Sequence, residues 1–206
     1  MKLVFVPARS KLDIKPVLKK VKIAGKIGLV ASIQFLHKLE EAKSVLKNSV
    51  VVGQVLGCNF TKADEHKDVD AYLYIGSAPF HPLGLAMHTK KPVYIANPLT
   101  NEFTKIDEKD ISDYEKSKKG KILQFLHATK IGILVSVKPH QGNFKRALEL
   151  QEKLKGKKEA FIFVCDEINP MQFENFNDIE CWVNTACPRI DIKGVVGLHD
   201  IAPYLE

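Results

Sequence analysis

The fold is decided by the stretch Ile27-Gly28-Leu29-Val30-Ala31, in which no residue is polar. A continuous apolar run of this length is typical of a strand buried on both faces of a sheet. An amphipathic segment follows at residues 35–46, and one face of it carries Phe35, Leu39, Ala42 and Leu46. That spacing predicts a helix packed on the strand. The first identifiable unit is therefore a buried strand followed by a covering helix.

The same alternation extends from this unit in both directions. Toward the N-terminus, Leu3-Val4-Phe5-Val6 predicts a strand, and a helix with Asp13 as its cap is predicted from the apolar positions Ile14, Val17, Leu18 and Val21. Toward the C-terminus we expect strands at residues 50–52, 71–75, 92–96, 131–137, 160–165 and 181–186. Helices are expected at residues 82–88, 110–129 and 144–154.

This order predicts an α/β protein with two similar domains, each a parallel sheet flanked by helices. We place the boundary near residue 128, at the end of the long polar helix, which gives domains at residues 1–127 and 128–206. In such sheets, ligands bind where the strands end. The loops expected there contain Gly57-Cys58, Gly76-Ser77, Gln141-Gly142 and Cys187-Pro188-Arg189.

Composition excludes several classes of protein. The 206 residues are 45% hydrophobic and 27% charged, with a net charge of +7 from 31 basic and 24 acidic side chains. The lysines are scattered, which favours a solvated surface, with a docking face for an acidic partner as the alternative. Motifs of the common nucleic-acid modules are absent, so no direct nucleic-acid binding is expected. Without a membrane-length apolar run or a signal peptide, we expect a cytoplasmic protein.

The sequence has four cysteines: Cys58, Cys165, Cys181 and Cys187. In a chain without secretory signals, disulfides are not expected, and the alternatives are packing, catalysis or metal binding. No CxxC pair occurs, which argues against a zinc ribbon or finger.

Three motifs carry a specific resemblance, and they occur in the order Gly53-Gln54-Val55-Leu56-Gly57-Cys58-Asn59-Phe60, then Tyr74-Ile75-Gly76-Ser77-Ala78-Pro79-Phe80-His81-Pro82-Leu83-Gly84-Leu85-Ala86, then Ala186-Cys187-Pro188-Arg189-Ile190. Together they closely resemble the diphthamide synthesis family, archaeal type. Shorter similarities at residues 5–8, Gln34 and residues 166–169 extend the resemblance over nearly the whole chain.

The resemblance implies three similar α/β domains, each presenting one cysteine, whose thiolates hold three irons of a [4Fe–4S] cluster and leave the fourth open to S-adenosylmethionine. Carried over by position, Cys58 corresponds to the ligand of the second domain and Cys187 to that of the third. The chain then lacks the first domain, which we expect a separate chain in a dimeric assembly to supply. Thiolates are the ligands that iron–sulfur clusters prefer, and the alternative is that each cysteine is a small buried hydrophobe.

The remaining cysteines fit the cluster less well. If residues 181–187 are extended at about 3.3 Å per residue, Cys181 and Cys187 lie about 20 Å apart and cannot share a cluster unless the segment folds back. Cys165 ends a predicted strand and remains an alternative ligand, although the family has no cysteine at either position.

Contacts to S-adenosylmethionine are expected from Gly76, Ser77, His81, Gln141, Gly142 and Arg189. His81 precedes Pro82 after a strand end, and a loop-capping role is its alternative. The loop of His140, Gln141 and Gly142 precedes a helix whose free amides suit a carboxylate, with a simple polar loop as the alternative. Arg189 can pair with that carboxylate or form a surface ion pair.

The implied activity transfers the 3-amino-3-carboxypropyl group of S-adenosylmethionine to a histidine of translation elongation factor 2. It is the first step of diphthamide biosynthesis, and no side chain is expected as a catalytic acid or base. The main alternative is a non-catalytic accessory or electron-transfer subunit of that enzyme. A generic nucleotide-binding module is the third reading, but no GxGxxG or GxxxxGK[ST] fingerprint occurs.

Overall fold

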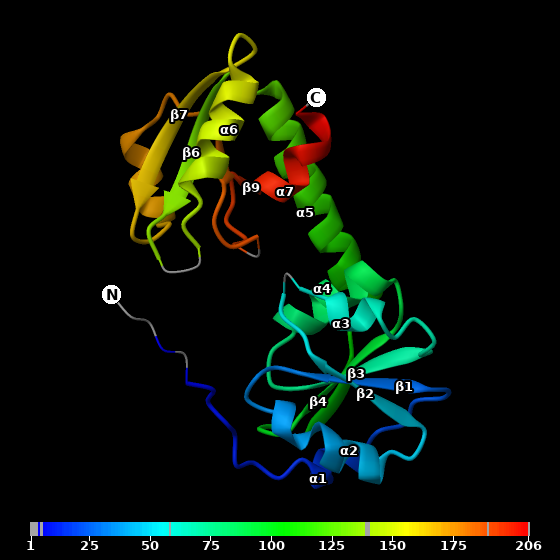
Figure 1. Cartoon of the computed structure of the whole chain (residues 1–206). Helices are drawn as coiled ribbons and strands as arrows, with labels where there is room; N and C mark the ends of the chain where they lie inside the picture. Colours follow the sequence, from blue (N-terminus) through cyan, green and yellow to red (C-terminus); the bar gives the residue numbers. More distant parts are fainter. Residues whose placement is uncertain (1–3, 5, 58, 139–140, 189, 206) are drawn as a thin grey trace. The chain divides into compact units, whose positions relative to one another are not determined.

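A computed structural model describes the chain except for residues 1–3, 5, 58, 139–140, 189 and 206 (Figure 1). The chain forms two compact units, Met1–Ser112 and Asp113–Glu206. The division falls within helix α5 (Glu108–His127). Our boundary lay at the C-terminal end of this helix. Phe125 and Ile122 of α5 pack into the core of the second unit, which places most of the helix with that unit.

The sheet of the first unit has the strand order β2-β1-β3-β4-β5. Its strands are β1 (Ile27–Ala31), β2 (Ser49–Gln54), β3 (Ala71–Ile75), β4 (Val93–Asn97) and β5 (Glu102–Lys105). The first four are parallel, and β5 is antiparallel to β4. Every residue of β1 and β3 is buried, as their continuous apolar sequences require.

Helices cover both faces of this sheet (Figure 1). On one face, α1 (Lys15–Leu18) and α2 (Leu39–Val45, preceded by the 3-10 turn η1, Leu36–Lys38) pack on alternate residues of β1 and β3. On the other face lie α3 (Thr61–Asp64) and α4 (Phe80–Thr89), whose Ala63 and Leu85 contact the opposite set of strand residues.

The second unit contains a four-stranded parallel sheet with the order β7-β6-β8-β9. Its elements after α5 are β6 (Lys130–Ser136), α6 (Phe144–Leu154), β7 (Glu159–Cys165), the 3-10 helix η2 (Pro170–Asn175), β8 (Cys181–Asn184), β9 (Val195–Gly197), α7 (Leu198–Ile201) and the 3-10 turn η3 (Ala202–Tyr204). Helices α5, α6 and α7 bury one face. The other face is closed by aromatic packing, in which Phe163, Phe173 and Phe176 surround Trp182.

The two units repeat one plan. In each, the first strand lies inside the sheet and has a glycine near its start that is paired with an aromatic residue: Gly28 with Tyr72, and Gly132 with Trp182. By the same register, Tyr74 of β3 and Asn184 of β8 occupy equivalent places. The predicted fold class of two similar α/β units is confirmed.

Some local predictions were wrong. The described residues of the expected strand at 3–6, Val4 and Val6, lie outside regular structure and are 81% and 83% exposed. A β-rich sequence forms a strand only where a partner strand is available, and the sheet begins with β1. The helix after Asp13 is a single turn, although Asp13 Oδ1 does accept a hydrogen bond from the Lys15 N–H at 2.9 Å.

Candidate functional site

In the first unit, the loops after β1, β2 and β3 leave the sheet at its carboxyl edge. The strand order reverses between β1 and β3, because β2 follows on one side and β3 on the other. Such a reversal opens a crevice between the two outgoing loops, which is the common ligand-binding place in α/β sheets. Ser32 begins one of these loops and Gly76-Ser77 begins the other.

Tyr74 lies beneath this crevice. Its side chain is 2% exposed, and its burial raises the pKa of the phenol, an effect that a hydrogen bond with Ser32 partly opposes. Gly76 packs so closely on the ring that a Cβ would come within 2.5 Å of Tyr74 Cε1. Gly76 is therefore required by packing, whereas Ser77 is exposed and available to a ligand.

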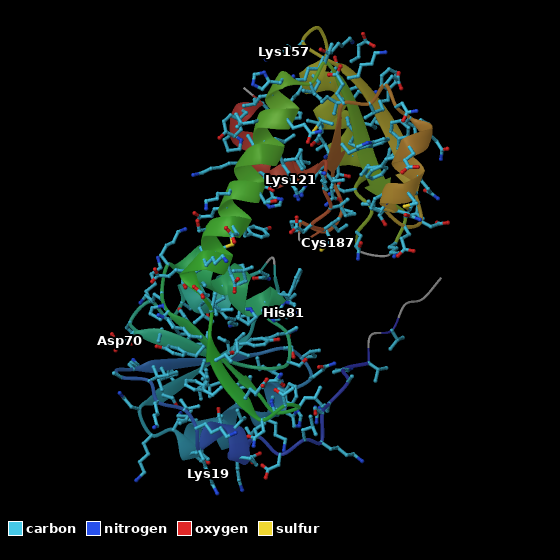
Figure 2. The ribbon with its side chains drawn as sticks, turned by 180° about the vertical axis from the view of Figure 1, so that it is seen from behind. Lys19, Asp70, His81, Lys121, Lys157 and Cys187 are labelled. Atoms are coloured by element: carbon cyan, nitrogen blue, oxygen red, sulfur yellow. The ribbon has the colours of Figure 1, made fainter. Side chains whose placement is uncertain are left out.

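His81 lies in the first turn of α4, where Figure 2 labels it. The ring is half-buried, with its centroid 6.1 Å from that of Tyr74 and 5.2 Å from that of Phe80. The structure thus brings Gly76 and His81 together on Tyr74. Whether His81 contacts a cofactor stays a prediction.

Cys58 lies outside the described residues, but the segments on either side of it are well tied. The Leu56 N–H donates to the Asn59 carbonyl at 3.3 Å. Asn59 Oδ1 accepts hydrogen bonds from the N–H and the hydroxyl of Thr61 at 3.1 and 2.9 Å. Phe60 stacks on His88 of α4, with ring centroids 5.1 Å apart. These contacts fix the ends of a short turn at the carboxyl side of β2.

Cys187 lies beyond the end of β8, the strand of the second unit that is equivalent to β3 (Figure 2). It is a half-buried free thiol. The Ile190 N–H donates to its carbonyl at 3.1 Å, and the side chain of Asn184 bonds the backbone on both sides of the residue. We call residues 186–190 the Cys187 turn, and note that Arg189, an expected cofactor contact, lies outside the described residues.

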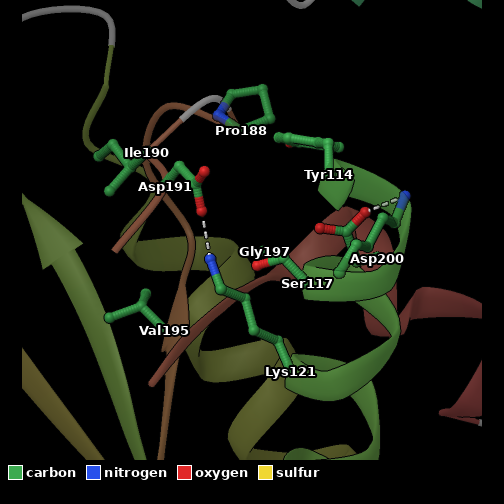
Figure 3. Close-up of a pocket in the computed structure, with 10 residues that line it drawn as sticks. Tyr114, Ser117, Lys121, Pro188, Ile190, Asp191, Val195, Gly197 and Asp200 are labelled. Atoms are coloured by element: carbon green, nitrogen blue, oxygen red, sulfur yellow. Dashed lines mark hydrogen bonds and ion pairs between the residues drawn. The ribbon is translucent and has the colours of Figure 1, made fainter. Parts of the chain in front are cut away.

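The Cys187 turn lies against α5, and the residue that follows it, Asp191, is tied to that helix (Figure 3). Lys121 of α5 forms an ion pair with Asp191, and Lys118 forms one with Asp200 of α7. A cavity of about 20 Å³, close to the size of one water molecule, lies among these residues and Pro188. The second unit therefore holds the turn by contacts on both of its flanks.

The loop after β6 runs toward the N-terminus of α6. The N–H groups of Gln141 and Gly142 donate to the Lys138 carbonyl at 3.0 and 3.2 Å, and a Cβ on Gly142 would come within 2.7 Å of the Ser136 carbonyl oxygen. Asn143 caps α6 by accepting from the Arg146 N–H at 3.1 Å. Gln141 is half-buried and Gly142 exposed, while His140 lies outside the described residues.

Of the other two cysteines, Cys181 serves packing, whereas Cys165 is half-buried at the end of β7 and stays an alternative ligand. Cys181 is 1% exposed in the core, where burial raises the pKa of its thiol to about 12. Burial, and then the charge of Asp166, raises the pKa of Cys165, whose Sγ lies 3.6 Å from the Val135 carbonyl oxygen. Among described residues, no three His, Cys, Asp or Glu side chains gather as a metal site.

Cys187 offers a soft sulfur ligand, the kind that iron–sulfur clusters prefer, on a turn held by Asn184, and it is less buried than Cys181. The fold and site thus define a class of protein with repeated α/β units, in which the second unit carries a free cysteine, Cys187, in a loop at the carboxyl edge of its sheet. The chain belongs to the diphthamide synthesis family: residues 1–195 match the family described as "Putative diphthamide synthesis protein".

The relatives that match this chain are named for the same enzyme activity. The chain is 32% identical over 208 residues to 2-(3-amino-3-carboxypropyl)histidine synthase of Pyrococcus horikoshii, an alignment covering 92% of this chain and 59% of the relative. It is 29% identical to 2-(3-amino-3-carboxypropyl)histidine synthase subunit 1 of Neurospora crassa, covering 81% of this chain and 40% of that protein. The chain thus spans about half the length of the curated relatives.

A solved crystal structure has a similar fold. The crystal structure of Dph2 from Pyrococcus horikoshii with a 4Fe-4S cluster is similar, with a TM-score of 0.85 and 31% identity, over 98% of this chain and 64% of that one. Sequence reasoning named the cysteines but missed the residues that support the site, Tyr74 and Asn184. Only strand register reveals that these two occupy equivalent positions.

Proposed function

We propose that this chain is a component of 2-(3-amino-3-carboxypropyl)histidine synthase, the enzyme of the first step of diphthamide biosynthesis. The observation that carries the proposal is Cys187, a half-buried free thiol on a turn braced by Asn184 and placed at the carboxyl edge of a parallel sheet. Membership of the family and the cluster-bearing crystal relative support it.

In this proposal Cys58 and Cys187 are ligands of a [4Fe–4S] cluster. Cys181 is buried in the core, and the family has no cysteine at the position of Cys165, so in this proposal Cys58 and Cys187 leave the ligand set one short. We assign the remaining thiolate to a separate chain in a dimeric assembly. Relatives named "subunit 1" support a system of several components.

S-adenosylmethionine would occupy the open iron. A bound cluster would supply the electron that cleaves a sulfonium C–S bond of S-adenosylmethionine, with methylthioadenosine as the leaving group. The 3-amino-3-carboxypropyl group would then replace a ring hydrogen of an imidazole of elongation factor 2, and that hydrogen would leave as a proton with one electron returned. The chain's residues bind and orient: Ser77 and His81 beside Gly76 in the first unit, and Gln141, Gly142 and Arg189 in the second. The helix N-terminus behind Gly142 suits the carboxylate of the cofactor.

A cytoplasmic location is part of the same proposal, because elongation factor 2 acts in translation. In the part of the chain that the structure describes, every helix is too short or too polar to cross a membrane.

Anaerobic reconstitution of a matched cysteine series tests the cluster assignment. Iron and sulfide content and the electron paramagnetic resonance spectrum are measured for Cys58→Ser and Cys187→Ser, with Cys165→Ser and Cys181→Ala as controls. We expect the first two variants to lose cluster iron in the assembly with the partner chain and the controls to retain it. Retention by Cys187→Ser would refute the assignment, and a full active cluster in the chain alone would refute the need for a separate chain.

The alternative is an accessory or electron-transfer subunit, which the naming of relatives as subunits keeps open. Cys187→Ala in the assembled complex separates the two readings. Loss of both cluster and group transfer supports a catalytic component, whereas full transfer by the variant assembly supports an accessory role.

A further inference from the structure

Asn184 is the last residue of β8 and one of the few buried polar residues, with 3% of its surface exposed. Its side chain uses both ends of the amide. Nδ2 donates a hydrogen bond to the Cys187 carbonyl oxygen at 2.8 Å, and Oδ1 accepts one from the Ala186 N–H at 2.8 Å. A buried side-chain amide with both ends occupied is a strong local constraint, because either end left unpaired carries a desolvation cost.

These two bonds enclose the backbone of the cysteine. The Ala186 N–H lies before Cys187 and the Cys187 carbonyl lies after its Cα, so the amide restrains the dihedral angles on both sides of the thiol-bearing carbon. The Ile190 N–H donates to the same carbonyl at 3.1 Å and closes the turn. The direction of the Cys187 side chain therefore depends on Asn184.

The fold itself does not require this asparagine. In the first unit the equivalent position is Tyr74, whose hydroxyl reaches Ser32 instead, and the loop that follows carries no cysteine. A buried strand end tolerates an aromatic residue there. The asparagine is therefore found where a cysteine turn follows the strand, and the sheet alone does not require it.

We propose that Asn184 is a positioning residue that sets the orientation of the Cys187 thiol for cluster ligation. This inference rests on the proposed function insofar as Cys187 is a cluster ligand. No other side chain of this size both donates and accepts at these two points: Asp offers acceptors alone when ionised, and Leu offers neither.

The first test uses the iron-free chain and so does not depend on the cluster. Asn184→Asp keeps the shape and the acceptor but removes the donor to the Cys187 carbonyl. The Ala186 N–H keeps its acceptor in this variant, so the change falls on the Cys187 carbonyl, to which the Ile190 N–H also donates. We expect amide exchange at Ile190, and alkylation of Cys187 followed by mass spectrometry, to accelerate on the order of tenfold, as loss of a buried hydrogen bond implies. Exchange in β6 should stay unchanged.

The matched control is Thr185→Val on the adjacent residue. Thr185 Oγ1 donates to the Leu134 carbonyl at 2.8 Å, so the variant loses a buried hydrogen bond without touching the Cys187 turn. It should leave the exchange at Ile190 and the alkylation of Cys187 as in the wild type. Should Asn184→Asp unfold the unit, Asn184→Ser, which can satisfy one end only, takes its place. Equal exchange and alkylation in the Asn184 variant and the wild type would overturn the proposal.

The second test adds the cluster to the assembly. Asn184→Asp should lower retained iron and alter the electron paramagnetic resonance spectrum, whereas Thr185→Val should match the wild type. A wild-type assembly that binds no cluster would refute the proposed function while the exchange result still decides the positioning of the turn. A cluster that is unchanged in Asn184→Asp would overturn the role of Asn184 in ligation.

Discussion

Gly132 of β6 lies directly against the indole of Trp182 on β8, so closely that a Cβ would come within 2.3 Å of Trp182 Cε3. The ring is held by Phe163 and Phe173 at centroid distances of 4.7 and 4.5 Å and cannot move aside freely. Gly132→Ala should therefore lower the free energy of unfolding by about 1–3 kcal/mol, the usual cost of overpacking a core. Urea denaturation monitored by tryptophan fluorescence measures it.

Gly120 in the middle of α5 provides the opposite case, because nothing lies within 4 Å of the position of its Cβ. Gly120→Ala should raise the free energy of unfolding by about 0.5–1 kcal/mol through helix propensity alone. For the Gly132→Ala prediction, a free energy of unfolding equal to that of the wild type would contradict it and would show that the rings around Trp182 can rearrange.

Cys181 predicts a loss of stability at alkaline pH. Burial raises the pKa of its thiol to about 12, while an unfolded cysteine ionises near about 8.5. Below about pH 8.5 the thiol keeps its proton in both the folded and the unfolded protein. Above this pH only the unfolded protein releases the proton, which favours unfolding, so stability falls as the pH rises toward 12. At one pKa unit per about 1.36 kcal/mol, the loss reaches about 2 kcal/mol at pH 10.

The variant Cys181→Ala isolates this effect from the buried tyrosines Tyr72 and Tyr74, whose pKa values burial also raises. We expect a lower free energy of unfolding at pH 7 because of the smaller side chain, and a shallower decline from pH 8.5 to 10. Denaturant titrations at a series of pH values give both. A decline as steep as that of the wild type would assign the alkaline loss to the tyrosines.

The ion pair between Lys118 and Asp200 predicts an unequal effect of two lysine substitutions in one helix. The Asp200 side chain is 12% exposed, so Lys118→Met leaves a mostly buried carboxylate without its main partner and should cost about 1–2 kcal/mol. Lys116 pairs with Asp113 at 3.7 Å, but both side chains are over half exposed, and Lys116→Met should change stability by less than about 0.5 kcal/mol. Thermal unfolding of the two variants at one ionic strength tests the difference, and equal losses would contradict it.

The sequence was sufficient for the elements whose signal is strong. Strands β1 and β3 are continuous apolar runs, and α6 has its apolar positions at helical spacing, so their types were predictable. Strand β5 was missed because it is a short antiparallel edge strand with mostly exposed residues. Strand β9 has three residues, too few to show a period.

The residues of the site also fall into those that the sequence predicts and those that it does not. Cys187 lies in a motif that can be read from the sequence, whereas Asn184 matters only because the register of β8 aims its amide at the turn three residues later. The expected strand at residues 3–6 fails for the complementary reason, since strand propensity does not say whether a partner is present. Long-range pairing is the information that a local pattern lacks.

Gly142 allows a test of the cofactor contact in the second unit. The first N–H groups of α6 lack partners within the helix, as in any helix, and Gly142 precedes them in the loop. In Gly142→Ala the new Cβ would meet the Ser136 carbonyl oxygen, which belongs to the strand and cannot yield, so the loop must shift. The affinity for S-adenosylmethionine should fall on the order of tenfold in the cluster-loaded assembly, as loss of one or two backbone contacts implies.

Isothermal titration calorimetry with the cluster-loaded assembly measures this affinity. Gly120→Ala serves as the control, because it changes a glycine of the same unit that lies within α5 and not in the loop before α6. The control should bind S-adenosylmethionine as the wild type does, and the resonance spectrum of the cluster without S-adenosylmethionine should be the same in all three proteins. A Kd unchanged in Gly142→Ala would remove this loop from the cofactor site, because the shift that the carbonyl oxygen of Ser136 imposes cannot leave a bound carboxylate in place.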